Sequence, residues 1–211
     1  MTTFEHVCNK KIITIIRDLK DLQVYKTVEA LYDGGIHLAE VTFNQNLSPK
    51  VTTDIIQTLN KDFKDKMIFG AGTVITMEQL YAAYDAGAAF IISPDANPSI
   101  IRETKRMGLL SMPGAFTATE VVNCHRAGAD IIKIFPSDTS GPAYIKALKG
   151  PLSHISMSAV GGVNLDNMVS FLNAGACCVG IGSNIIDKKA IEENNYDHIR
   201  SLADAYTKKL Q

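Results

Sequence analysis

One lysine stands out among the residues whose chemistry could serve a reaction. Lys133 lies inside the apolar run IIKIFP, residues 131–136, which has the pattern of a buried strand. Burying an ammonium group without a partner is costly, so burial favours the neutral amine, which is a nucleophile. Such an amine can form a Schiff base with a carbonyl substrate. The alternative is a structural lysine whose amine reaches solvent from the end of the strand.

A carboxylate occupies a similar position earlier in the chain. Glu40 lies in the apolar run HLAEVTF, residues 37–43, and has Leu38 and Thr42 on its own side of the predicted strand. If both strands face one interior, Glu40 could act as an acid and base beside Lys133. The alternative is a buried salt bridge between the two. Because a buried ion pair stabilises a fold poorly compared with apolar residues of similar volume, the pattern favours a reactive site.

The elements that would position these residues repeat along the chain. Five helical stretches end at a glycine that suits a left-handed helix cap, and an apolar strand follows each one: Gly35, Gly87, Gly108, Gly128 and Gly175. Eight strands are predicted, near residues 11–16, 37–42, 67–71, 89–93, 109–113, 130–135, 154–160 and 176–181. This alternation predicts an α/β fold, a single (β/α)8 TIM barrel formed by one domain of residues 1–211. A doubly wound open sheet is the alternative, but no GxGxxG follows the first strand.

A barrel of this kind carries its active site at the C-terminal ends of its strands. Two glycine-containing turns follow the seventh and eighth predicted strands, at Gly161 and Gly162 and at Gly182 and Ser183. Their bare backbone N–H groups fit a phosphate site, although tight turns alone would also explain them. Other candidate residues end the remaining strands: Arg17, Thr73 and Pro94.

Composition limits the classes of function. The chain is 46% hydrophobic and 20% charged with a net charge of -1, which predicts an ordinary globular protein without a broad nucleic-acid-binding surface. Its four cysteines show no metal-ligand spacing, so we expect reduced thiols and no metal. The N-terminus carries charges where an export signal would be apolar, and no run is long enough to span a membrane. We therefore expect a cytoplasmic protein.

Several ordered motifs resemble one family over nearly the whole chain. They are EVT (40–42), GAGTV (70–74), ISP (92–94), PG (113–114), KIFP (133–136), GG (161–162) and GIGS (180–183). The chain resembles the class I aldolases that cleave 2-keto-3-deoxy-6-phosphogluconate, its galactonate epimer and 4-hydroxy-2-oxoglutarate. The resemblance implies a homotrimer that needs no cofactor and acts on a small phosphorylated keto acid. It also implies the residue roles: Lys133 forms the Schiff base, Glu40 is the acid and base, Thr73 holds the pyruvyl carboxylate and the glycine turns hold the phosphate, with Pro94 and Phe135 completing the substrate site.

Three positions bear on the choice of substrate. Gluconate-type members have an arginine four residues after the glutamate, where this chain has Asn44, so Arg17 becomes the candidate partner of the substrate carboxylate. Val160 stands before the glycine pair, where gluconate-type members usually carry threonine. Both features favour the galactonate epimer, although Val160 could serve packing alone. Two rival functions are a phosphosugar isomerase or epimerase, which needs no imine, and a barrel that binds a sugar phosphate without turnover.

Overall fold

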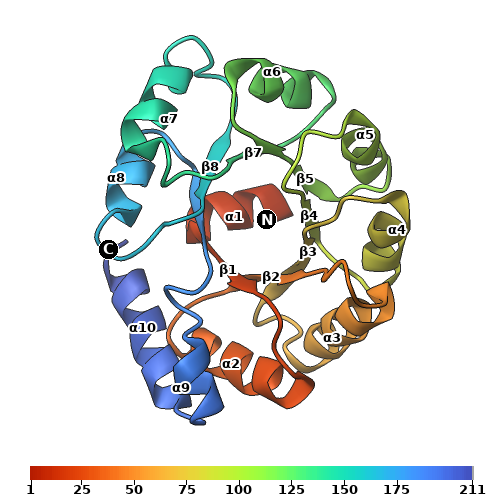
Figure 1. The fold of residues 1–211 in the computed structure, drawn as a ribbon, viewed down its shortest axis with the longest axis vertical. Helices are drawn as coiled ribbons and strands as arrows, with labels where there is room; N and C mark the ends of the chain where they lie inside the picture. Colours follow the sequence, from red (N-terminus) through yellow and green to blue (C-terminus); the bar gives the residue numbers. More distant parts are fainter. Residues whose placement is uncertain (211) are drawn as a thin grey trace.

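The protein is a parallel barrel surrounded by helices (Figure 1). The computed structural model describes residues 1–210. The strands are β1 (Ile12–Ile16), β2 (Leu38–Thr42), β3 (Ile68–Gly72), β4 (Phe90–Ile92), β5 (Leu110–Met112), β6 (Gly114–Ala115), β7 (Ile132–Ile134), β8 (Met157–Val160) and β9 (Cys178–Ile181). The helices are α1 (Thr3–Lys10), α2 (Asp21–Asp33), α3 (Pro49–Asp62), α4 (Met77–Asp85), α5 (Pro98–Arg106), α6 (Ala118–Arg126), α7 (Gly141–Lys149), α8 (Met168–Asn173), α9 (Lys188–Glu192) and α10 (Tyr196–Lys208).

The strand order β5-β4-β3-β2-β1-β9-β8-β7-β6 closes the barrel through the segment that contains β5 and β6. That segment pairs with β4 through β5 and with β7 through β6. Pro113 separates its two halves because proline has no N–H to continue the ladder. The Pro113 carbonyl still accepts a hydrogen bond of 2.8 Å from the Lys133 N–H. The predicted (β/α)8 barrel is therefore confirmed, with the fifth predicted strand split in two.

Local sequence signals set the ends of the helices. The five predicted cap glycines all have positive φ, for example +82° at Gly87 and +101° at Gly128. Thr76 and Thr117 accept hydrogen bonds from the N–H groups at the starts of α4 and α6, as expected of N-cap residues. Each predicted strand begins one to three residues later than predicted, and the difference is largest for β8, which starts at Met157 because residue 154 lies in a turn and residue 155 in a bend.

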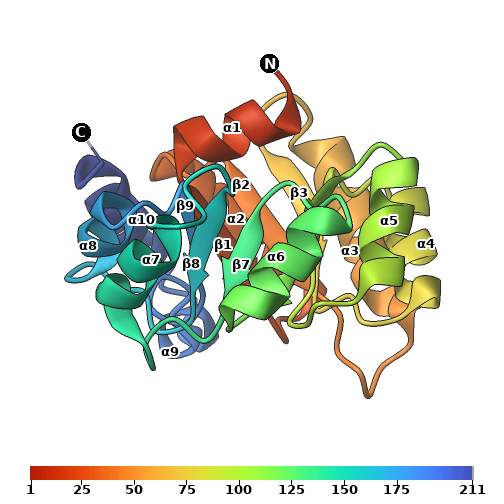
Figure 2. The ribbon, with the colours of Figure 1, turned by 90° about the horizontal axis from the view of Figure 1, so that it is seen from above.

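Helix α1 was not predicted, and it covers one mouth of the barrel. It crosses the centre of the view in Figure 1 and lies above the strands in Figure 2. Its Val7 is fully buried in an apolar cluster with Ile13, Leu38 and Phe90, which line the interior near the N-terminal ends of the strands. This mouth is therefore filled, and only the opposite mouth is available for a ligand.

Two further findings bear on the expectations from sequence. All four cysteines are free. Among the residues that the structure describes, no helix is both long enough and apolar enough to cross a membrane.

Candidate active site

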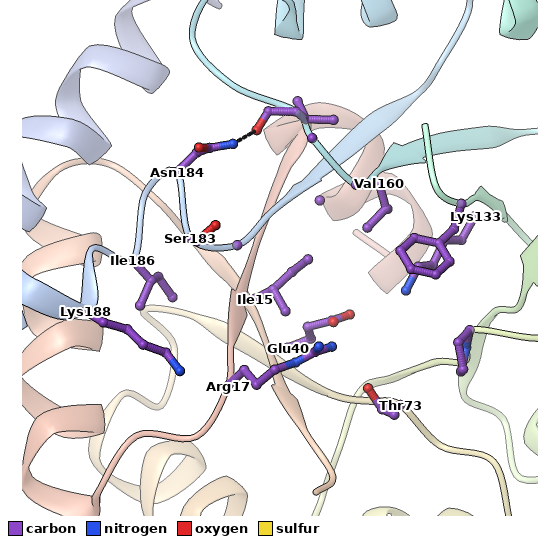
Figure 3. Close-up of a pocket in the computed structure, with 17 residues that line it drawn as sticks. Ile15, Arg17, Glu40, Thr73, Lys133, Val160, Ser183, Asn184, Ile186 and Lys188 are labelled. Carbon is purple, nitrogen blue, oxygen red and sulfur yellow. Dashed lines mark hydrogen bonds between the residues drawn. The ribbon is translucent and has the colours of Figure 1, made fainter. Parts of the chain in front are cut away.

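A cavity of about 520 Å³ opens at the C-terminal ends of the strands, away from α1 (Figure 3). Its size is that of a small-molecule site. Residues from five strands (β1, β2, β7, β8 and β9) line it, together with residues that follow strands, including Thr73 after β3 and Pro94 after β4. Eleven of the twelve predicted site residues are among them: Arg17, Glu40, Thr73, Pro94, Lys133, Phe135, Val160, Gly161, Gly162, Gly182 and Ser183.

Lys133 is the central residue of β7 and points into this cavity. The residue is 7% exposed, and burial lowers the pKa of its amine. The nearby Glu40 carboxylate opposes this shift, whereas the Arg17 guanidinium lowers the pKa of Lys133 further. The amine lies 4.8 Å from the centre of the Phe135 ring, which covers it on one side. This environment favours the neutral, nucleophilic amine.

Glu40 extends from β2 toward the same space and is 2% exposed. Burial raises the pKa of its carboxyl group, while the charges of Lys133 and Arg17 act in the opposite direction. Gly72 of β3 makes room for it, because a Cβ atom there would lie 2.7 Å from Oε1 of Glu40. No ion pair joins Glu40 to Lys133 among the described residues, so a structural salt bridge does not account for them.

Arg17 and Asn44 occupy different environments. Arg17, just after β1, lines the cavity and lies beside Glu40 in Figure 3. Asn44 is not among the described residues that line the cavity. Its side-chain amide donates to Asp18 at 2.8 Å, and its side-chain oxygen accepts from the Asn46 N–H at 2.9 Å. Asn44 therefore ties the loop after β2 to the loop that carries Arg17, and its contact with substrate stays a prediction.

The two glycine turns form one wall of the cavity. None of the N–H groups of Gly161, Gly162, Gly182 and Ser183 donates a hydrogen bond to another described residue. Asn184 connects the turns, since its side chain donates to the Val163 carbonyl at 2.8 Å (Figure 3). This wall can offer several backbone donors to an anion.

The first turn is also held from the side of β7. Ser137, which follows KIFP, is fully buried and accepts a hydrogen bond of 3.1 Å from the Val160 N–H. Its own N–H donates to the Val160 carbonyl at 2.8 Å. The segment that carries Lys133 therefore fixes the turn that follows β8.

A polar network supports Thr73, which lines the cavity with a left-handed φ of +57°. Gln45 donates to the Thr73 carbonyl at 3.1 Å and accepts a hydrogen bond of 2.8 Å from Gln79. Because a non-glycine residue adopts this φ at some cost, the two glutamines help to hold Thr73 in place.

Sequence reasoning missed the part of the wall formed after GIGS. Asn184, Ile186 and Lys188 all line the cavity. Their only signal in the sequence is their position after the last strand of the barrel, where loops contribute to the active site. Ile15, whose side chain points into the barrel from β1, was also missed.

A buried amine and a buried carboxyl group at the C-terminal mouth of a (β/α)8 barrel are the groups that an enzyme of the Schiff-base class needs. The family model described as KDPG and KHG aldolase matches residues 4–202. The 2-dehydro-3-deoxy-6-phosphogalactonate aldolase of Escherichia coli is 34% identical over 95% of this chain and 96% of its own length. The chain therefore belongs to the KDPG and KHG aldolase family, whose named members are carbon–carbon lyases.

The chain is also similar to chains of solved structures. A KDPG aldolase from Legionella pneumophila, with pyruvate captured as a covalent carbinolamine intermediate, has a TM-score of 0.88 and 29% identity, covering 97% of this chain and 98% of that one. A cube-shaped cage designed by fusing symmetric oligomeric domains contains a chain with a TM-score of 0.84 and 34% identity, covering 94% of this chain and 71% of that one.

Proposed function

We propose that the protein is a class I aldolase that cleaves a 2-keto-3-deoxy-6-phospho sugar acid to pyruvate and glyceraldehyde 3-phosphate. The observation that carries the proposal is the arrangement of Lys133 and Glu40, which are buried from different strands at one cavity without pairing. An isomerase or epimerase would have no use for a neutral amine at this position. A barrel that only binds its ligand would gain nothing from two costly buried groups.

The reaction proceeds through an imine. The neutral amine of Lys133 attacks the C2 ketone, and loss of water from the carbinolamine gives a protonated imine. Glu40 removes the proton of the C4 hydroxyl, directly or through a water molecule, and the electron pair of the C3–C4 bond moves into the imine. Glyceraldehyde 3-phosphate leaves as the aldehyde. Protonation at C3 and hydrolysis of the imine then release pyruvate and restore the amine, so no metal or organic cofactor is required.

The cavity supports a definite orientation of this substrate. Arg17, whose charge acts on both reacting groups, holds the carboxylate next to the ketone of the substrate, and Thr73 in the lining of the same cavity assists it. The glycine turns hold the phosphate with their free N–H groups. Pro94 and Phe135 line the same cavity, and the Phe135 ring lies next to the Lys133 amine that carries the imine.

Val160 favours the galactonate epimer. Its side chain is buried in the cavity wall and presents only methyl groups to the substrate. A threonine there would offer a hydroxyl to the C4 oxygen, whose configuration distinguishes the two epimers. The comparison that decides this point is the turnover of the two C4 epimers, with 4-hydroxy-2-oxoglutarate as the third substrate. Faster cleavage of the gluconate epimer would contradict the assignment.

Trapping of the imine tests the reaction itself. Incubation with pyruvate and borohydride is expected to add one reduced pyruvyl group to Lys133, detected by mass spectrometry of the peptide. Lys133→Ala is expected to lose both the adduct and the cleavage activity. An unchanged adduct on the Lys133→Ala variant would show that another amine is the nucleophile.

We also propose that the protein works as a homotrimer in the cytoplasm. The similar chain in a cage built from symmetric oligomeric domains supports an oligomer. Light scattering is expected to give three times the chain mass of 22.9 kDa, and a monomeric mass would contradict the trimer.

A further inference from the structure

Lys188 is a second cation in the wall of the cavity, and no step of the reaction uses it. It is the first residue of α9, and its side chain extends toward the cavity beside Ile186 (Figure 3). The side chain is exposed and forms neither a hydrogen bond nor an ion pair with another described residue. A free ammonium group at the edge of a ligand cavity is available to an anion.

The position of Lys188 differs from that of Arg17. The Arg17 charge shifts the pKa values of both Glu40 and Lys133, so Arg17 lies near the reacting groups. The charge of Lys188 contributes to neither shift. In Figure 3 it lies across the cavity from Lys133, on the side of the loop that carries Ser183. The cavity therefore has one cation at the imine end and another at the far end.

The two anionic groups of the proposed substrate are separated in the same way as these two cations of the cavity. Its carboxylate is attached to the carbon next to the imine, and its phosphate lies four carbons beyond the imine. The phosphate carries about −1.5 to −2 charges near pH 7, whereas the glycine turns supply only neutral N–H donors. Of the described ionisable residues that line the cavity, Lys188 alone is both cationic and distant from the reacting groups.

We infer that Lys188 binds the substrate phosphate and thereby sets the preference for phosphorylated over unphosphorylated substrates. This inference rests on the proposed aldolase function. The flexible side chain of Lys188 would place its ammonium group next to the phosphate as a point charge, while the two glycine turns supply directed hydrogen bonds. Lys188 is then a specificity residue with no part in bond cleavage.

The test compares Lys188→Gln with Lys189→Gln, a neighbouring change in the same helix at a residue that does not line the cavity. The KM for glyceraldehyde 3-phosphate in aldol addition to pyruvate is expected to rise about tenfold in Lys188→Gln, as for one partly exposed charged hydrogen bond. It should stay within about twofold in Lys189→Gln. Added salt should raise the KM of the parent protein more than that of Lys188→Gln, because the lost contact is electrostatic.

Pyruvate serves in this test as the ligand that has no phosphate. Its half-saturating concentration for borohydride trapping on Lys133 is expected to be equal in the parent protein and in Lys188→Gln, which also shows that the variant is folded. An unchanged KM for glyceraldehyde 3-phosphate, or an equal loss for both ligands, would overturn the role of Lys188. A parent protein that traps no pyruvate would instead contradict the proposed function.

Discussion

At the scale of single residues, the site depends on two groups that are costly to bury. Lys133 and Glu40 are 7% and 2% exposed, and burial shifts the pKa of each toward its neutral form. The neutral amine can attack a ketone, and a carboxylate whose pKa is raised is a stronger base for the proton of the C4 hydroxyl. Arg17 tunes both, since its positive charge lowers the pKa of the amine and of the carboxyl group.

The pH dependence of imine trapping follows from these shifts. Below the pKa of Lys133 the amine is protonated and cannot attack, so the trapping rate should rise with pH and level off once the amine is neutral. Because burial lowers this pKa, the plateau should be reached below the value of about 10.4 that is usual for lysine. The measurement is the rate of adduct formation with saturating pyruvate and cyanoborohydride across the pH range.

Two variants should move this pH profile in opposite directions. Glu40→Gln removes a negative charge that raises the pKa of Lys133, so the midpoint should fall. Arg17→Gln removes a positive charge that lowers this pKa, so the midpoint should rise. Identical midpoints in all three proteins would mean that these charges do not control the amine.

At the scale of elements, backbone signals explain which parts of the fold and site were predictable. Cap glycines and apolar strands recur along the chain, so the barrel and the strand ends that carry Lys133 and Glu40 followed from sequence. Helix α1 was missed although Thr2 and Glu5 form a capping box, because eight residues around one buried Val7 give little periodicity. Asn44 and Lys188 could not be placed, since neither a loop nor the first residue of a five-residue helix has a periodicity that shows where a side chain points.

A small residue on a neighbouring strand is a further requirement of the site. In β3, Gly72 leaves room for the Glu40 carboxylate, and a Cβ atom would lie 2.8 Å from its carboxyl carbon and 3.0 Å from a methyl group of Thr42. Gly72→Ala is therefore expected to displace Glu40 and to lower kcat by about 10- to 100-fold, as general acid–base catalysis loses its geometry. Pyruvate trapping on Lys133 should change much less than cleavage.

Gly150→Ala is the matched control for this change. Gly150 has a helical backbone, and a Cβ atom there would approach only the Ala147 carbonyl, at 3.3 Å. The kcat of Gly150→Ala should equal that of the parent protein. Equal kcat values in Gly72→Ala and the parent protein would show that the carboxylate does not need this space.

At the scale of the whole molecule, one mouth of the barrel forms the ligand cavity and the other is packed with apolar side chains. The C-terminal mouth holds the cavity with its charged and polar lining, whereas α1 and an apolar cluster fill the N-terminal mouth. Packing at the N-terminal end of the barrel stabilises the fold. This stability offsets the free-energy cost of burying Lys133 and Glu40 at the C-terminal end. Substitutions at the two mouths should therefore have different consequences for stability and activity.

Val7→Ala tests this separation. Val7 is fully buried between α1 and the strands, so removing two methyl groups should lower the free energy of unfolding by about 1–3 kcal/mol. Val51→Ala, at a residue of α3 that is 44% exposed, should cost less than about 0.5 kcal/mol. Urea unfolding would measure both, and kcat and KM below the transition should match those of the parent protein. A loss of kcat in Val7→Ala at full folding would show instead that packing at the closed mouth controls the position of Lys133 or Glu40 at the open one.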